Sequence, residues 1–272
     1  MGRMRAILLS THPGPAVAVT AITVLLAVAG GLEPWRVVVL GLVMALNQAS
    51  VGLSNDWIDA DRDRAVARAD KPVARGDVAP ALARNVAVAA AVAAIGLSFV
   101  LGWPAVLAHL VNLGGGWAYN AGLKRTPLSV LPYIAAFGVL PSLVTLAAPQ
   151  PAFAPVWITA AGALLGAGAH FANVLPDLED DARTGVRGLP HRIGRVGSLV
   201  LTWVTLLAAA IALAAGIGFT TPLGIAGTGV AVIIAFAGLV LGLRRTPTRV
   251  LFRLVILAAL VDVAMLVISS VG

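Results

Sequence analysis

The chain of 272 residues contains no cysteine, and only 11% of its residues are charged. Without cysteine there can be no disulfide, no thiolate catalysis and no zinc–thiolate site, so any metal must be bound through oxygen or imidazole. Ordinary soluble domains carry about 25% charged residues. Here 59% of the residues are hydrophobic and the mean hydropathy is +0.95, so we predict an integral membrane protein.

Apolar segments long enough to cross the roughly 30 Å hydrocarbon core of a bilayer occur nine times. They cover residues 14–32, 36–54, 84–102, 104–121, 128–148, 153–175, 196–217, 221–243 and 250–270. The first could also pass for a signal peptide, but it fits better as the first span of a polytopic protein. The predicted fold class is therefore all-α, a single membrane domain over residues 1–272 with nine transmembrane helices in a bundle.

The basic residues are distributed unevenly among the loops. Of the nineteen lysines and arginines, only Arg36 lies in a loop on the opposite side from all the others. Because lysine and arginine remain on the cytoplasmic side, we predict a bacterial plasma-membrane protein with a cytoplasmic amino terminus and an extracytoplasmic carboxyl terminus. The same bias explains the net charge of +7 without nucleic acid as a partner, and the lipid bilayer is the expected surrounding.

The twelve acidic residues are concentrated in and around two copies of the pattern N-x-x-x-D-x-x-x-D. The pattern occurs as Asn55, Asp59 and Asp63 and again as Asn173, Asp177 and Asp181. Four-residue steps on an α-helix keep side chains on one face, so each copy should form an oxygen-bearing stripe at a cytoplasmic helix end. The copies begin at positions 55 and 173, four spans apart, which predicts a repeat of spans 1–4 in spans 5–8, with span nine added.

Facing clusters of carboxylates repel each other unless cations lie between them. Mg²⁺ prefers carboxylate oxygens, phosphate oxygens and water, so the two stripes predict Mg²⁺ that bridges the protein to a diphosphate. Basic residues such as Arg68, Lys71 and Arg183 follow the motifs and would neutralise the remaining phosphate charge. The alternative is that these charges only solvate loops. It is a reasonable explanation for the arginines, but it does not readily explain two equally spaced Asn/Asp motifs at equivalent helix ends.

Several stretches resemble the UbiA superfamily of intramembrane prenyltransferases, and the resemblance covers essentially the whole chain. The two Asn/Asp motifs resemble the paired motifs of that superfamily. The stretch Lys71-Pro72-Val73-Ala74-Arg75-Gly76 is similar to its Arg-Pro-x-x-x-Gly stretch, with Lys71 where arginine is usual. The stretch Tyr119-x-x-x-Leu123-Lys124-Arg125 is similar to its tyrosine and lysine after the fourth helix.

The resemblance implies Mg²⁺-dependent transfer of a prenyl group from an isoprenyl diphosphate to a small-molecule acceptor, aromatic or otherwise lipophilic. The implied catalytic residues, which draw off the diphosphate and leave an allylic cation, are Asn55, Asp59, Asp63, Asp177 and Asp181. The implied metal ligands are the same four aspartates with Asn55 and Asn173. We expect the diphosphate to be bound by Arg68, Lys71, Tyr119, Lys124, Arg125 and Arg183.

Two other functions remain open. In a terpene cyclase of the same superfamily, a double bond of the substrate itself would attack the cation, and the motifs would be the same. We favour the transferase because only 6% of residues are aromatic and no aromatic-rich pocket stands out, whereas a cyclising cation needs several ring faces. The apparent repeat also suggests a transporter. A transporter would place its sites near the bilayer midplane, whereas the carboxylates of this chain are expected at cytoplasmic helix ends.

Other polar residues within the predicted spans are assigned individually. Asp262, in the ninth span, is expected to make a structural hydrogen bond, although an ionisable group in a span is also a functional candidate. Further candidates for the wall of the cavity are Asn47, His109, Asn112 and His170. Trp117 is expected to pack against neighbouring helices.

Overall fold

The structure is a computed structural model that describes residues 2–244 and 248–271. Within these residues every regular element is helical, so the predicted all-α fold class is confirmed. Residues 245–247, in the loop between the predicted segments 221–243 and 250–270, lie outside the described residues.

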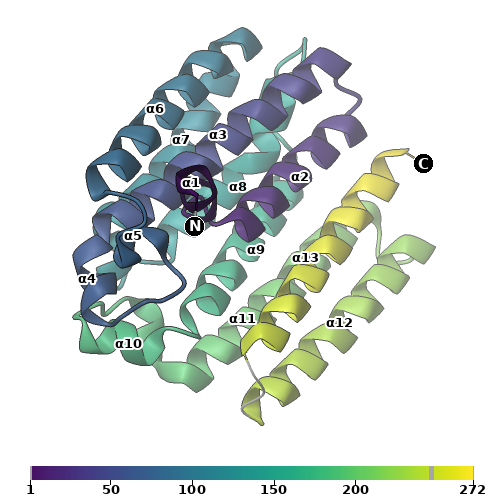
Figure 1. The fold of residues 1–272 in the computed structure, drawn as a ribbon. Helices are drawn as coiled ribbons and strands as arrows, with labels where there is room; N and C mark the ends of the chain where they lie inside the picture. The colour runs from purple at the N-terminus through teal and green to yellow at the C-terminus, as the bar shows by residue number, and fades with distance from the viewer. Residues whose placement is uncertain (1, 245–247, 272) are drawn as a thin grey trace.

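The long helices of the described residues correspond one to one with the nine predicted segments (Figure 1). They are α2 (Pro13–Ala29), α3 (Pro34–Ile58), α6 (Pro80–Ser98), α7 (Trp103–Ala121), α8 (Leu131–Leu146), α9 (Val156–Val174), α11 (Leu189–Ile217), α12 (Pro222–Leu243) and α13 (Thr248–Val271). Short elements join them: α1 (Arg3–Leu9), α4 (Ala60–Ala65), α5 (Pro72–Arg75), α10 (Leu178–Arg183) and the 3₁₀ turns η1 (Phe99–Leu101) and η2 (Leu123–Arg125).

Proline marks where many of these helices begin. Pro13, Pro34, Pro80 and Pro222 are each the first residue of a long helix. A proline lacks the N–H group that the first turn leaves unpaired in any case, and its fixed φ angle suits the start of a helix. The same prolines therefore end the preceding loop and begin the next apolar helix.

Four helical segments of the described residues are individually long and apolar enough to cross a membrane. They are α3, α6 continued through η1, α11 and α12. The pair α1 and α2, bent by 62° at the break between them, would add a fifth if it is counted as one span. A membrane-type helical protein is thus supported, while the total of nine spans remains a prediction.

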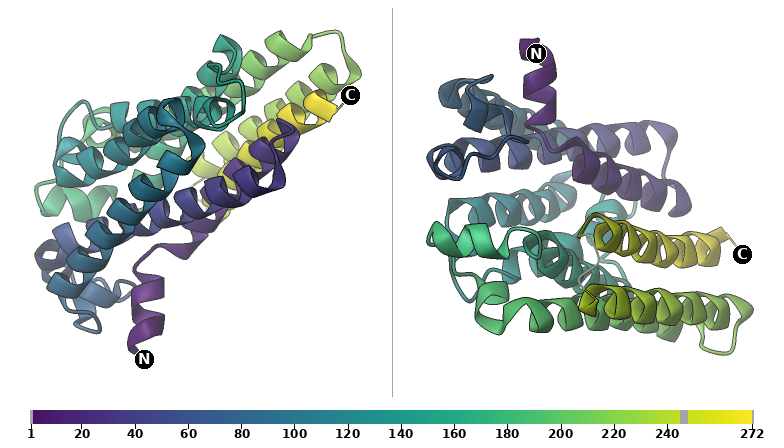
Figure 2. Two further views of the ribbon diagram at one scale, coloured as in Figure 1. Left: turned by 90° about the horizontal axis from the view of Figure 1, so that it is seen from above. Right: turned by 60° about the horizontal axis from the view of Figure 1, so that its bottom comes forward.

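The long helices pack side by side into one bundle, and α1 stands at an angle to it (Figure 2). In the first half of the chain α3 packs along α2 and α6, and in the second half α9 packs along α8 and α11. The last helix, α13, contacts α2. The short helices α4, α5 and α10 gather at one end of the bundle, at the lower left of Figure 1, so both Asn/Asp motifs lie at that end.

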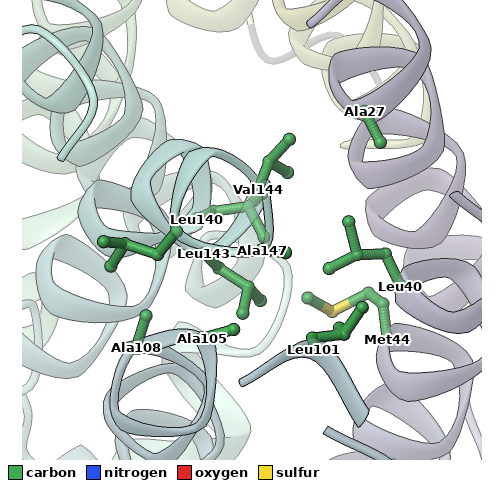
Figure 3. Packing of buried hydrophobic residues seen from close by; sticks show 11 residues of the cluster. Ala27, Leu40, Met44, Leu101, Ala105, Ala108, Leu140, Leu143, Val144 and Ala147 are labelled. Carbon is green, nitrogen blue, oxygen red and sulfur yellow. The ribbon is translucent and has the colours of Figure 1, made fainter. Parts of the chain in front are cut away.

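The apolar core between α3 and α8 lies away from the motifs. Leu40 and Met44 of α3 point toward Leu140 and Leu143 of α8, with Leu101 beside them (Figure 3). Leu40 precedes Asn55 by fifteen positions on the same helix, which corresponds to roughly 22 Å along its axis. The core between α3 and α8 is therefore apolar, whereas the end of the bundle that holds the motifs is charged.

Close packing of α11 against α12 depends on a glycine. Gly238 lies directly over the indole ring of Trp203, so a Cβ atom at this position would overlap with the ring. Trp203 is buried in a cluster with Leu199 and Ile234. Because small residues let apolar helices approach closely where no solvent drives them together, Gly238 sets the distance between these two helices.

We predict that Gly238→Ala destabilises the protein by about 1–3 kcal/mol, the usual cost of overpacking. The change should appear as a lower thermal unfolding temperature in detergent. Gly229→Ala on the same helix is the matched control, because Gly229 is exposed and a Cβ atom there meets no neighbour within 4 Å. Equal unfolding temperatures for the two variants would contradict this account of the α11–α12 contact.

Candidate active site

Each Asn/Asp motif spans a break between two helices. α3 ends at Ile58 and α4 begins at Ala60, with Asp59 between them. In the second motif α9 ends at Val174, and Asp177 caps the start of α10. The prediction of a stripe on one continuous helix is therefore wrong for both motifs.

The four-residue spacing survives the breaks in part. The backbone N–H of Asp59 donates to the carbonyl of Asn55 (3.0 Å), and that of Asp63 donates to the carbonyl of Asp59 (2.8 Å). In the second motif the N–H of Asp181 donates to the carbonyl of Asp177 (2.8 Å). The break turns the chain while the carboxylates of each motif stay close together.

The two motifs, far apart in the sequence, meet through arginines of the first. Arg62 Nη2 lies 3.0 Å from Asp59 Oδ2, and Arg62 Nη1 lies 3.4 Å from Asp181 Oδ1. Arg68 Nη1 lies 3.2 Å from Asp177 Oδ1. The predicted approach of the two motifs is thus present, with guanidinium groups between their carboxylates.

Lys71, at the start of α5, is buried among acceptors of the first motif. Its Nζ lies 2.9 Å from Asn55 Oδ1, 2.8 Å from Asp63 Oδ2 and 3.3 Å from Asp56 Oδ1. Burial alone would lower the pKa of Lys71, but Asp56 and Asp63 outweigh it, so the pKa is raised and the amine stays charged. A compact ammonium group with three partners suits this position, which explains why lysine works where the superfamily pattern has arginine.

Lys124, in the turn after α7, pairs with another aspartate of the same motif. Its Nζ lies 2.5 Å from Asp59 Oδ2. Burial lowers the pKa of Lys124, and the carboxylate of Asp59 offsets only part of this effect. In the second motif, burial raises the pKa of Asp181 to about 6, although Arg62 acts in the opposite direction.

Sequence reasoning missed several neighbours of the motifs. Arg62 was not singled out, and neither was His12, whose Nε2 lies 2.8 Å from Asp56 Oδ1. His12 adopts a left-handed backbone conformation (φ 53°), which is uncommon for a residue other than glycine. Asn120 accepts a hydrogen bond from Asn55 Nδ2 (3.1 Å). His12 and Asn120 lie more than 40 positions from their partners, so no local pattern could have identified these contacts.

A cavity of about 350 Å³ extends from the charged cluster into the bundle. Its charged end is lined by Asp59, Asp177, Asp181, Arg62 and Lys124, and its apolar wall by Val19, Ala136, Phe137 and Leu140. Leu140 also belongs to the apolar core of Figure 3. The cavity thus suits a ligand with a charged head and an apolar tail.

Most of the predicted site residues line this cavity. They are Asn55, Asp59, Arg68, Lys71, Tyr119, Lys124, Asn173, Asp177 and Asp181. Asp63 is buried beside it, held by Lys71 and Arg62. The structure does not bring Arg125 or Arg183 to the cavity: both are exposed, and Arg183 pairs with Asp180 on its own short helix.

The other polar candidates have different outcomes. Asn47, Asn112 and His170 line the cavity, and Asn47 Nδ2 donates to Asn112 Oδ1 (2.9 Å). His109 is buried and does not line it. Trp117 packs as predicted, with its Nε1 donating to Ser50 Oγ (3.0 Å). The prediction that Asp262 makes a hydrogen bond is wrong. Its side chain is buried, and neither carboxylate oxygen has a hydrogen-bond partner among the described residues.

An aromatic cluster lines the cavity, contrary to the prediction from composition. The ring of Tyr133 lies 5.1 Å from that of Tyr119, 5.1 Å from that of His170 and 6.2 Å from that of Phe137, centroid to centroid. All four side chains line the cavity. The overall share of aromatic residues is low, but both tyrosines of the chain are at this site.

The oxygen-rich donor set suits a hard divalent cation such as Mg²⁺. Asp59 Oδ1 is buried without a hydrogen-bond partner, so one oxygen of the first motif is still available. In the described residues, however, no three acidic or histidine side chains are already arranged around a common point as metal ligands. The cations that offset the carboxylate repulsion here are the basic side chains of the chain itself.

Apolar helices around a cavity that is charged at one end define a membrane-type protein with a cavity suited to an ionic head and an apolar tail. The sequence matches the UbiA prenyltransferase family over residues 16–266, and the chain belongs to this family. The resemblance identified from the motifs is therefore confirmed. It establishes the class of enzyme, a prenyltransferase of the UbiA type.

Relatives and solved structures agree with this membership. A digeranylgeranylglyceryl phosphate synthase of Natronomonas pharaonis is 29% identical over 204 residues, 73% of each chain. One of Methanopyrus kandleri is 28% identical over 212 residues, 76% of this chain and 77% of the relative. A UbiA homolog from Archaeoglobus fulgidus bound to GPP and Mg²⁺ has a TM-score of 0.70 at 17% identity, covering 98% of this chain and 100% of its own. One from Aeropyrum pernix has a TM-score of 0.77 at 16% identity, covering 94% and 98%.

We predict that Lys71→Met lowers the free energy of unfolding by about 3 kcal/mol, because it leaves buried carboxylates without their cation. Chemical denaturation in detergent would measure the loss. Arg64→Met is the matched control: among the described residues Arg64 pairs only with Asp61, whose side chain is 97% exposed, and such pairs contribute less than about 1 kcal/mol. Similar losses for the two variants would show that the buried ion pairs of Lys71 do not stabilise the fold.

Proposed function

We propose that the protein transfers a prenyl group from an isoprenyl diphosphate to a small-molecule acceptor in a reaction that requires Mg²⁺. The observation that carries this proposal is the cavity, which has both aspartate motifs at its charged end and an apolar wall beyond them. Relatives named as digeranylgeranylglyceryl phosphate synthases support it, as do structural neighbours bound to GPP or DMAPP with Mg²⁺.

The motif residues would hold the metal and the head of the substrate. Asp59, Asp63, Asp177 and Asp181 are the proposed Mg²⁺ ligands, and the amide oxygens of Asn55 and Asn173 complete the donor set. Bound Mg²⁺ supplies the positive charge that stabilises the diphosphate as it leaves. Binding the head group at this end orients the prenyl tail along the apolar wall.

Basic and aromatic side chains take the remaining roles. Arg68, Lys71 and Lys124 line the charged end and are proposed to pair with phosphate oxygens. The rings of Tyr119 and Tyr133 would face the allylic cation and stabilise it through their π faces. The apolar wall excludes water, which would otherwise capture the cation.

A terpene cyclase is the second candidate, and the aromatic cluster at the cavity favours it. Tyr119, Tyr133, Phe137 and His170 provide several ring surfaces around one space, the feature that composition alone failed to reveal. The relatives that are named for a synthase of a diprenylated glyceryl phosphate favour transfer to an acceptor. We therefore retain the transferase as the proposed function.

We also propose the finer membrane arrangement. All nine long helices would span the bilayer, with the amino terminus in the cytoplasm and the carboxyl terminus outside. The uneven distribution of lysine and arginine supports this orientation. The charged end of the cavity would then open toward the cytoplasm, where water-soluble diphosphate can leave.

Asp59→Asn and Asp177→Asn should each abolish Mg²⁺-dependent release of diphosphate, because each removes a charged oxygen donor from one motif. Release can be measured with geranyl diphosphate and geranylgeranyl diphosphate at saturating Mg²⁺. Asp61→Asn is the matched control, since Asp61 lies between motif positions but is exposed, and it should retain wild-type activity. Wild-type turnover by either motif variant would overturn the proposed metal site.

Release of diphosphate should rise strongly when the correct acceptor is added, because a transferase cation is consumed by a nucleophile. Geranylgeranylglyceryl phosphate, the precursor implied by the names of the relatives, and an aromatic acid are the first acceptors to test. The product is identified by mass spectrometry. Full-rate conversion of the diphosphate to a cyclic product without acceptor would instead establish the cyclase.

A further inference from the structure

One arginine links the two aspartate motifs. Arg62 of α4 forms ion pairs with Asp59 (3.0 Å) and Asp63 (3.4 Å) of the first motif and with Asp181 (3.4 Å) of the second. Among the described residues, no other side chain pairs with motif aspartates from both copies: Lys71 and Lys124 reach only the first, and Arg68 and His191 only the second. The guanidinium group of Arg62 therefore lies between the carboxylates that the proposed function assigns to Mg²⁺.

The surroundings of Asp59 show why this position matters. Asp59 Oδ2 accepts hydrogen bonds from Arg62 Nη2 (3.0 Å) and Lys124 Nζ (2.5 Å), while Oδ1 is buried without a partner. A cation that bridges Asp59 and Asp181 would occupy the region where Arg62 now lies. Both cannot be there together, because like charges at such short range repel strongly in a partly buried site.

Arg62 is more accessible to water than the two lysines that pair with the first motif. Its side chain is 16% exposed, compared with 5% for Lys124 and 8% for Lys71. It is carried by α4, a helix of only six residues. The long side chain can turn outward without disturbing the packed helices α3 and α9.

We propose that Arg62 holds the two motifs together in the metal-free protein and is displaced from Asp59 and Asp181 when a divalent cation binds. This inference rests on the proposed function only in assigning a divalent cation to these carboxylates. Arg62 is thus a positioning residue that competes with the metal. Its removal should destabilise the metal-free protein and strengthen metal binding.

The test uses the purified full chain and MgCl₂, with no substrate. Thermal unfolding of wild type and Arg62→Gln is followed by tryptophan fluorescence in EDTA and in a series of MgCl₂ concentrations. In EDTA, Arg62→Gln should unfold at a lower temperature than wild type. Mg²⁺ should raise its unfolding temperature by more than it raises that of wild type, and half of this rise should be reached at an Mg²⁺ concentration lower by up to about fivefold. Free Mn²⁺, measured by electron paramagnetic resonance, gives the same comparison as a direct binding measurement.

Two further variants make the result specific. Arg64 lies on the same short helix and pairs with exposed Asp61, so Arg64→Gln should match wild type in EDTA and in Mg²⁺. Arg62→Lys keeps a charge but loses the planar guanidinium group that reaches both motifs. Its changes in unfolding temperature and in Mg²⁺ affinity should therefore have the same direction as those of Arg62→Gln and be smaller. Should Arg62→Gln fail to fold, Arg62→Lys carries the comparison.

A purely structural arginine would give a different pattern. In that case Arg62→Gln and Arg62→Lys would lose the same amount of stability with and without Mg²⁺, and metal affinity would be unchanged or weaker, which would overturn the inference. No response to metal in wild type or in the Arg62 variants would overturn it as well. The diphosphate-release assay reports separately on the proposed function, because Asp59→Asn can abolish turnover whatever Arg62 does.

Discussion

The site depends on the electrostatic repulsion between two groups of carboxylates that the fold places at one end of the bundle. Five aspartates converge there, and four basic side chains lie among them: Arg62, Arg68, Lys71 and Lys124. Burial makes this balance obligatory, because an unpaired charge costs several kcal/mol away from water. The ends of α3 and α9 can therefore be close only while cations lie between them, whether these belong to the protein or to a bound metal.

The same constraint explains the shape of the helices at the site. A continuous helix would leave its last carbonyl groups and the motif carboxylates in one line along the bundle axis. The breaks at Asp59 and before Asp177 turn the chain across the mouth of the cavity instead, so α4 and α10 bring their charged side chains toward each other. Ala136, Phe137 and Leu140 of α8, with Val19 of α2, then form an apolar wall that suits a hydrophobic tail.

Much of this arrangement could be predicted from the sequence, since long apolar runs separated by prolines define helices by composition alone. These runs predicted the nine long helices. The two Asn/Asp motifs predicted the resemblance to the UbiA superfamily and the approach of the motifs to each other. The helix breaks were not predicted, because the pattern N-x-x-x-D-x-x-x-D fits an unbroken helix equally well. Arg62 was missed because its role depends on Asp181, which the sequence places far away.

The aromatic residues show why counting cannot replace position. A low aromatic share argued against a pocket with several ring faces, yet both tyrosines of the chain lie at the cavity with Phe137 and His170. In the described part of the chain, only three of the fifteen phenylalanine, tryptophan and tyrosine residues line the cavity, so the aromatic share of the whole chain says little about the number of rings at one place. Together with the carboxylates, these rings outline a space with ionic groups at its mouth and π surfaces just inside. Under the proposed function, the basic side chains among these carboxylates would stabilise negative charge on the leaving group, and the rings would stabilise positive charge on the prenyl carbon. This is the charge separation that ionisation of an allylic diphosphate requires.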